Sequence, residues 1–175
     1  MDTRAYFAHA YPYEALQAFL TLRGDKFCDR EFAIEGEWFR RYVVAHNAQD
    51  LKRQVLAMPD VKSIHIGPIY SNGVARAREG GSHPVRREFV IDIDLTDLPH
   101  LKLVGRDGRF DVDACDRAWP VCALALFFAK RLLREAFGFE QFAVIYSGRR
   151  GAHLHVLDER AVALDDEGRT AVACY

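Results

Sequence analysis

Two aspartates separated by one residue, Asp92 and Asp94, stand in the apolar segment 88–97. Successive side chains of a β-strand alternate between its faces, so a strand here would place both carboxylates on one face. Neighbouring carboxylates repel each other, and a hard cation such as Mg²⁺ or Mn²⁺ relieves that repulsion through oxygen ligation. The pattern therefore predicts a divalent metal site, the alternative being a strand end with solvated acids. The opposite, buried face is predicted to carry Phe89, Ile91, Ile93 and Leu95.

A glycine- and arginine-rich turn follows the apolar run Phe142–Tyr146, which predicts a buried strand. The turn, residues 147–151, reads Ser-Gly-Arg-Arg-Gly. Its glycines let backbone N–H groups approach an anion, while Arg149 and Arg150 add permanent positive charge suited to phosphate oxygens. The turn predicts a triphosphate site, the alternative being a solvated hairpin tip.

The segment after this turn is predicted to be a second strand. Alternation places His153 and His155 on one face and Ala152, Leu154 and Val156 on the other. His153 lies nearer the turn and can donate a hydrogen bond to a phosphate or a departing pyrophosphate; the alternative is a satisfied surface pair. A metal site beside a triphosphate site is what nucleotidyl transfer requires.

Both motifs, in this order and spacing, resemble the catalytic small subunit of the archaeal and eukaryotic DNA primases, in the primase–polymerase superfamily. The similarity runs from about Tyr6 to the last residue, and Ser-Gly-Arg-Arg-Gly-x-His is its most specific part. Further matching segments are Arg30-Glu31-Phe32, Arg41-Tyr42, the stretch 65–71, Trp119 with its helix, and Phe137-Gly138-Phe139.

The resemblance implies an enzyme that synthesises short RNA primers on single-stranded DNA for replication, by two-metal nucleotidyl transfer. It implies that Asp92 and Asp94 bind Mg²⁺ or Mn²⁺. It also implies nucleoside triphosphates as substrates, a large primase subunit as heterodimer partner, a link to a replicative DNA polymerase complex, and nuclear localisation if the source is eukaryotic. The nucleotide-binding residues that it implies are Ser147, Arg149, Arg150, His153, Arg41 and Glu31.

The chain departs from the family pattern at three places. The family's third metal-binding aspartate lies further downstream, so we expect the N-terminal portion of a longer protein; the alternative is a truncated, non-catalytic module that binds nucleotide or a partner. His65 replaces an aspartate near the ribose, which leaves ribonucleotide preference open. The family also has a zinc site built from Cys and His ligands. Here Cys115 is present, but Ala118 replaces a second cysteine and Cys122 is expected in the core. The zinc ligands are therefore mostly missing.

The positioning elements predict an α/β (α+β) fold around a central sheet. The resemblance implies that this is the mixed sheet of the primase–polymerase type, flanked by helices and incomplete at the C-terminal end. It also implies one partial catalytic domain over 1–175. Leu124, Phe128 and Leu132 recur at helical spacing, and the aromatic residues of that helix are expected in the core. The expected helices are 12–22, 49–58 capped by Asn47, 119–137 and a last one opening at 169, with strands at 31–34, 38–45, 63–69, 88–97, 142–146 and after 151.

Composition discriminates less than the motifs. The 175 residues are 50% hydrophobic, enough for one core, and 24 basic against 25 acidic residues give a net charge of −1, which argues against strong independent DNA binding. The arginine-rich segment 74–87 is a candidate phosphate-backbone contact or a solvated loop. Four scattered cysteines, with no secretory signal and no membrane-spanning stretch, predict an intracellular protein without membrane association.

Two other enzyme classes use parts of the same pattern. A glycosyltransferase also holds a metal–nucleotide with Asp-x-Asp, but a parallel α/β pattern would normally precede the motif, and the Arg-Arg turn has no role there. A hydrolase built on His153, His155 and the aspartates ranks last among these alternatives.

Overall fold

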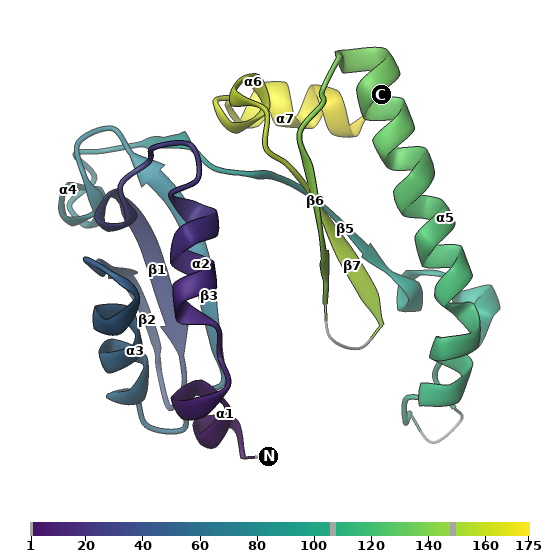
Figure 1. Ribbon diagram of the computed structural model, residues 1–175, viewed down its shortest axis with the longest axis horizontal. Helices are drawn as coiled ribbons and strands as arrows, with labels where there is room; N and C mark the ends of the chain where they lie inside the picture. Colours follow the sequence, from purple (N-terminus) through teal and green to yellow (C-terminus); the bar gives the residue numbers. More distant parts are fainter. Residues whose placement is uncertain (1, 106–107, 148–149) are drawn as a thin grey trace. The chain divides into compact units, whose positions relative to one another are not determined.

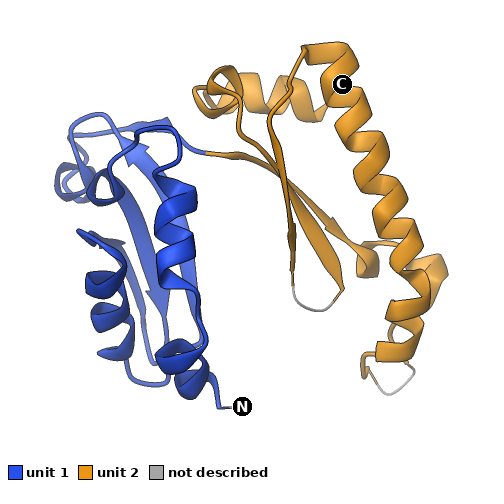
Figure 2. Cartoon of the chain, in the orientation of Figure 1, with its two compact units in different colours: residues 1–87 blue, residues 88–175 orange. Residues whose placement is uncertain are grey.

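The computed structural model describes residues 2–105, 108–147 and 150–175. The chain divides into two compact units, Met1–Arg87 and Glu88–Tyr175 (Figure 2). Each unit combines helices with an antiparallel sheet, which confirms the predicted α+β class. That both units together make one catalytic domain stays a prediction.

The first unit is built on a four-stranded antiparallel sheet in the order β2-β1-β3-β4. Phe32 and Ile34 of its strand β1 are fully buried and pack with Leu51 and Val55 of helix α3. Asn47 caps α3 as predicted, because its side chain accepts a hydrogen bond from the Asp50 amide at 2.9 Å. The elements are α1 (Thr3–His9), α2 (Tyr13–Leu20), β1 (Arg30–Glu35), β2 (Phe39–Val43), α3 (Ala48–Leu56), β3 (Ser63–Tyr70), α4 (Val74–Arg78) and β4 (Pro84–Arg86), with a 3-10 turn at Phe27–Asp29.

The second unit is built on a three-stranded antiparallel sheet in the order β5-β7-β6, with the long helix α5 beside it (Figure 1). The buried face of this sheet, including Leu154 and Val156, packs with Cys122 and Leu126 of α5. The elements are β5 (Phe89–Asp94), α5 (Val112–Phe137), β6 (Phe142–Tyr146), β7 (Gly151–Val156), α6 (Glu159–Val162) and α7 (Asp166–Ala173), with 3-10 turns at Leu95–Asp97 and Pro99–Leu101.

The single mixed sheet that we expected is not what the described strands form. They form two separate sheets, and every strand pair in them is antiparallel. Short turns join β1 to β2 and β6 to β7, and such turns permit only antiparallel pairing, whereas parallel strands need a crossover of a dozen residues or more.

Helix α5 differs from its prediction in both its start and its buried face. It begins at Val112, because the Asp111 side chain caps it by accepting a hydrogen bond from the Ala114 amide at 2.8 Å. The expectation that its aromatic residues lie in the core is wrong for Phe127 and Phe128, which are 58% and 56% exposed, whereas Trp119 and Phe137 are partly buried against the core. This helix is apolar on two sides, and the narrow sheet buries only one of them. The buried side consists of Cys115, Ala118, Cys122, Leu126 and Leu133.

Strand β6 exists where the sequence predicts it but is not buried. Val144 is 51% exposed and Tyr146 is 58% exposed. The reason is its place at the edge of the sheet, where β7 is the strand that it pairs with.

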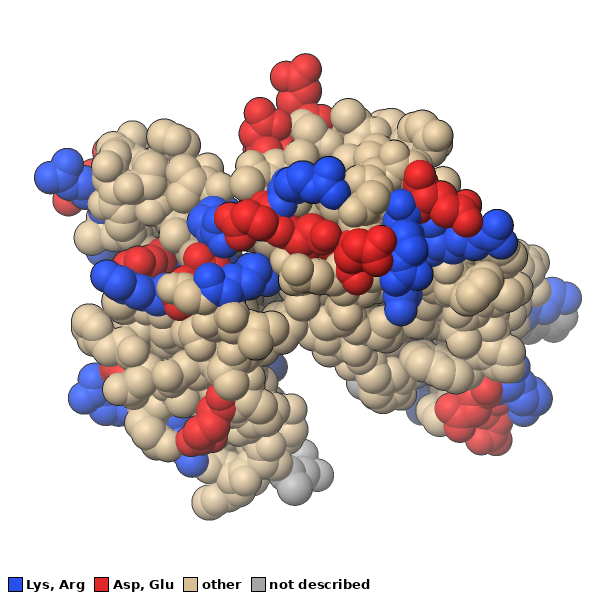
Figure 3. Space-filling view, turned by 45° about the horizontal axis from the view of Figure 1, so that its top comes forward, with Lys and Arg blue, Asp and Glu red and all other residues tan. Residues whose placement is uncertain are grey.

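The arginine-rich segment 74–87 is part of the packed first unit. It forms α4 and β4, Val74 is buried, and Arg86 Nε lies 3.0 Å from Asp25 Oδ1. Its contact with a phosphate backbone stays a prediction. On the face seen in Figure 3, acidic and basic side chains lie interspersed.

Cys115 and Cys122, which the resemblance brought into question as zinc ligands, both lie on α5. Cys115 and Cys122 are buried there, which confirms the core position expected of Cys122. Burial raises the pKa of the Cys122 thiol above its ordinary value, so this sulfur stays protonated. Across the part of the chain described here, no helix combines the length and apolar character needed to cross a membrane.

Candidate active site

The pairing of β5 with β7 brings the two sequence motifs together. Asp92 stands opposite His153 in this pair, and Asp94 stands opposite Gly151. Their side chains, on the face of the sheet away from its buried side, help to line a cavity of about 390 Å³. The residues that line it are Asp92, Asp94, Ser147, Arg150 and His153, all predicted as site residues from the sequence.

The carboxylate of Asp94 is held at both oxygens. Its Oδ2 accepts a hydrogen bond from Arg150 Nε at 2.7 Å, while its Oδ1 accepts two from Thr96, at 2.8 Å from the amide and 2.6 Å from Oγ1. Partial burial raises the pKa of Asp94, but the Thr96 hydrogen bonds and the Arg150 charge outweigh it and lower the pKa below its ordinary value. Asp94 is therefore ionised at neutral pH.

Asp92 is the more open of the two carboxylates. Its side chain is 67% exposed, and Oδ1 lies 3.4 Å from Nε2 of His153. The cavity thus presents one fixed carboxylate and one exposed carboxylate from the same strand face.

The turn between β6 and β7 is anchored to both neighbouring strands. Ser147 donates a hydrogen bond from Oγ to the carbonyl oxygen of Gly151 at 2.8 Å, and its amide donates to the same oxygen at 3.0 Å. The Leu95 amide donates to the carbonyl oxygen of Arg150 at 2.9 Å. The first two bonds tie Ser147 to β7, and the third holds Arg150 beside Leu95, the residue that follows β5. Gly148 and Arg149, predicted for the same turn, lie outside the described residues.

The donor set of the cavity fits a hard divalent cation. Carboxylate oxygens are the ligands that Mg²⁺ and Mn²⁺ prefer, and Asp92 and Asp94 offer them from one side of the cavity. Within 2–105, 108–147 and 150–175, no group of three or more His, Cys, Asp or Glu side chains gathers as a metal site.

The remaining predicted residues, Glu31 and Arg41, lie together in the first unit. Glu31 is 2% exposed and accepts hydrogen bonds from Arg41 Nε at 3.1 Å and Nη2 at 3.3 Å, from the Tyr42 amide at 3.1 Å, and from the Tyr70 hydroxyl at 2.7 Å. The half-exposed Arg41 is thereby held in a fixed orientation by a buried carboxylate.

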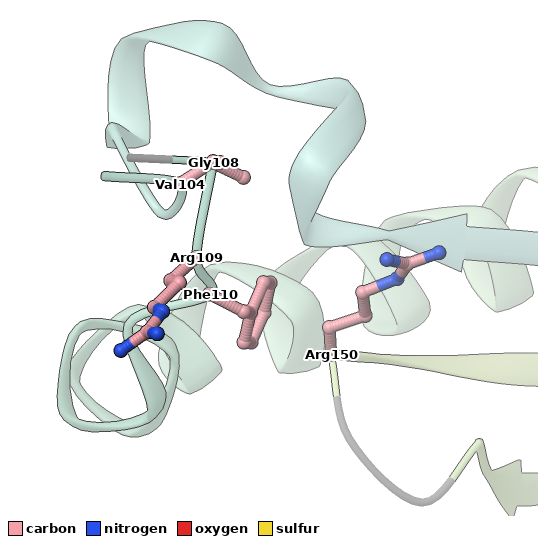
Figure 4. A pocket seen from close by; sticks show the side chains of 5 residues that line it. All are labelled: Val104, Gly108, Arg109, Phe110 and Arg150. Atoms are coloured by element: carbon pink, nitrogen blue, oxygen red, sulfur yellow. The ribbon is translucent and has the colours of Figure 1, made fainter. Parts of the chain in front are cut away.

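A second cavity, of about 520 Å³, shares Arg150 with the first. It is lined also by Val104, Gly108, Arg109 and Phe110 (Figure 4). Figure 4 shows the guanidinium of Arg150 directed toward β5 and away from Arg109 and Phe110. Arg150 thus lines both cavities, and its guanidinium is bonded to Asp94 of the first one.

We predict that the stability of the protein depends on pH through His155, the histidine of β7 farther from the turn. Burial, with a smaller contribution from His153, lowers the pKa of His155 below its ordinary value despite the opposing effect of Glu88. The unfolded chain therefore binds a proton more readily than the native chain below about pH 6.5. We expect the free energy of unfolding to fall as pH drops from 7.5 to 5.5, and to fall less in His155→Gln. Urea titrations of both proteins at the two pH values measure this difference, and equal falls would contradict it.

Thr96 is a site residue that the sequence reasoning missed. It contacts Asp94 from two positions further along the chain, at the start of the 3-10 turn that ends β5. A hydroxyl residue two positions after an aspartate at a strand end is the local signal that could have identified it.

Comparisons with known proteins agree with the resemblance read from the motifs. The family model described as DNA primase small subunit matches residues 91–175. The DNA primase small subunit of Schizosaccharomyces pombe is 31% identical over 97% of this chain and 38% of its own length. The Drosophila melanogaster protein of the same name is 33% identical over 97% of this chain and 39% of its own length. The Saccharomyces cerevisiae protein of that name is 32% identical over 99% of this chain and 43% of its own length. The chain thus spans about two fifths of the length of these relatives.

Proposed function

We propose that this chain, which is related to DNA primase small subunits along nearly its whole length, provides the catalytic site of a DNA primase. The proposed reaction joins ribonucleotides into short RNA primers on a single-stranded DNA template. One observation carries the proposal: the aspartates and the polar residues of the turn line a single cavity of about 390 Å³.

The two aspartates are proposed to hold Mg²⁺ or Mn²⁺. When bound, such a cation lowers the pKa of an attacking hydroxyl and stabilises the charge that develops on the phosphate oxygens. The role of Asp92 and Asp94 is to provide negatively charged oxygens from one strand face. Thr96 and Arg150 hold the carboxylate of Asp94 in place.

The β6–β7 turn is proposed to bind the triphosphate of the incoming nucleotide. Arg150 and His153 line the cavity beside the aspartates and can donate to phosphate oxygens, and Ser147 adds a hydroxyl at the base of the turn. Arg149 is proposed for the same role from its place in the motif. Arg41, oriented by Glu31, is proposed as a further phosphate contact.

Arg150 is expected to affect metal and nucleotide binding in opposite directions. It now neutralises Asp94, so a cation at that carboxylate must coexist with its charge or displace it. In Arg150→Ala we expect Mn²⁺ to bind about tenfold more tightly without nucleotide, because a neighbouring positive charge is gone. We expect the affinity for a nucleoside triphosphate to fall at least about tenfold, because a charged hydrogen bond is lost.

Titrations with Mn²⁺, followed by electron paramagnetic resonance, and with a nucleotide analogue measure both affinities. Arg131→Ala is the matched control, since Arg131 Nε also lies 2.7 Å from a carboxylate, that of Glu135, but on the exposed side of α5. A weaker Mn²⁺ affinity in Arg150→Ala would contradict the placement of this side chain beside the metal site.

The proposed function is tested by primer synthesis with ribonucleoside triphosphates on a single-stranded DNA template. Labelled RNA of a few nucleotides is the expected product. Nucleotide binding without product would favour the non-catalytic module, and release of nucleoside products without polymer would favour a hydrolase.

The further partners follow from the same kinship and are proposals. They are a large primase subunit in a heterodimer and a replicative DNA polymerase complex. For a eukaryotic source, the proposed localisation is nuclear.

The preference for ribonucleotides is proposed to depend on the surroundings of His65. Its Nε2 lies 2.8 Å from Ser63 Oγ and 3.5 Å from Glu35 Oε2. Competition between ribo- and deoxyribonucleoside triphosphates in the same assay measures that preference.

A further inference from the structure

The two aspartates of the cavity differ in how their carboxylates are held. Asp92 is 67% exposed and contacts His153 at 3.4 Å. The Asp94 side chain is 21% exposed, and three donors reach it at 2.6 to 2.8 Å. An ionised carboxylate is an acceptor with two oxygens, so the distribution of these donors determines which oxygen remains available to a ligand.

Thr96 occupies one oxygen of Asp94 completely. Its amide and its hydroxyl both donate to Oδ1, at 2.8 and 2.6 Å. The short contact from the hydroxyl is of the length found when the acceptor is charged. Because both bonds go to the same oxygen, they fix the rotation of the carboxylate and turn Oδ2 toward Arg150, which lines the cavity.

We propose that Thr96 is the positioning residue of the metal site, whose hydroxyl holds Oδ1 of Asp94 so that Oδ2 faces the cation. The proposal rests on the proposed function, because it takes Asp94 as a metal ligand. Groups that hydrogen-bond to a ligating carboxylate orient it and tune its affinity, although they do not touch the metal themselves. The amide of Thr96, which donates to the same oxygen, caps the 3-10 turn at Leu95–Asp97, whose N-cap residue is Asp94.

A hydroxyl that only stabilises the turn and a hydroxyl that positions Asp94 predict different measurements. Loss of a local stabilising hydrogen bond lowers the stability of the turn and leaves the metal affinity of a correctly folded site unchanged. Loss of a positioning group lowers metal affinity. Thr96→Val keeps the shape and the amide donor and removes the hydroxyl, Thr96→Ala removes it with less bulk, and Thr96→Ser keeps it.

The test is a titration of the purified chain with Mn²⁺, followed by electron paramagnetic resonance and by the paramagnetic broadening of amide signals near the cavity. We expect Mn²⁺ affinity to fall about tenfold or more in Thr96→Val and Thr96→Ala, and to stay within about twofold in Thr96→Ser. Thr170→Val is the matched control, because the hydroxyl of Thr170, an exposed residue of helix α7, also makes a local hydrogen bond, to the Asp166 carbonyl oxygen at 2.8 Å. Thermal unfolding of each variant reports separately what the hydroxyl contributes to stability, since all three variants keep the capping amide.

Asp94→Asn separates failure of this inference from failure of the metal site. Native affinity in Thr96→Val, with affinity lost in Asp94→Asn, would overturn the role of Thr96 and leave the metal site in place. Native affinity in Asp94→Asn would overturn the metal site, and the role of Thr96 with it.

Discussion

Asp94→Asn is expected to lower primer synthesis by about three orders of magnitude or more, which corresponds to about 4 kcal/mol of transition-state stabilisation. Asparagine has nearly the same shape as aspartate, and its carbonyl oxygen can still accept the hydrogen bonds from Thr96. The negative charge that attracts the cation is lost. Because Arg150 is also left without its ion-pair partner, the positive charge in the cavity further disfavours a metal ion.

The matched control for this variant lies three residues along the chain. Asp97 is an exposed aspartate in the 3-10 turn that follows β5 and does not line the cavity. Asp97→Asn removes the same charge and should retain primer synthesis within about twofold, since exposed charges act weakly at a distance. Comparable losses in both variants would show that the activity depends on the net negative charge of this region rather than on Asp94 as a metal ligand.

Gly151→Ala is expected to destabilise the second unit by about 3 kcal/mol and to abolish nucleotide binding. A Cβ atom at this position would lie 2.0 Å from the carbonyl oxygen of Ile93, far inside van der Waals contact. The clash is with backbone, so no side-chain rotation relieves it. The β5–β7 pair must separate where Asp94 stands opposite Gly151, and the two motifs then no longer share one cavity.

Denaturation of the second unit can be followed by the fluorescence of Trp119, whose ring contacts Tyr146. Trp38, the other tryptophan of the chain, is 52% exposed in the first unit and is replaced by phenylalanine in all samples. Gly81→Ala is the control, because a Cβ there meets its nearest atom, the Arg76 carbonyl oxygen, at an ordinary 3.6 Å. An unchanged Trp119 transition in Gly151→Ala would refute the close approach of the two strands.

The local geometry of the cavity was predictable from alternation alone. Asp92 and Asp94 share one face of β5, and His153 and His155 share one face of β7, because side-chain direction in a strand follows directly from sequence position. The meeting of the two motifs depends on the pairing of β5 with β7, between which α5 and β6 intervene in sequence. Residue spacing does not specify that pairing, and the family resemblance supplied the expectation that the motifs meet.

Burial was the least predictable property, because it depends on which neighbours an element acquires. The apolar run of β6 reads as a core strand, yet it lies at a sheet edge with Tyr146 exposed. Phe128 has the spacing of a core residue, but α5 carries two apolar sides and buries the other one. Thr96 was not predicted as a site residue, because a threonine after a strand is common. Its role is indicated only by the distance of 2.6 Å between its Oγ1 and Oδ1 of Asp94.

The most direct test of the proposed active site is a crystal structure of the chain with Mn²⁺ and a non-hydrolysable ribonucleoside triphosphate, phased to show the anomalous signal of manganese. We expect a manganese peak between the carboxylates of Asp92 and Asp94, with the triphosphate against Ser147, Arg150 and His153. Manganese and triphosphate bound elsewhere, with Arg150 still paired to Asp94, would contradict the central claim that these residues form one nucleotidyl-transfer site.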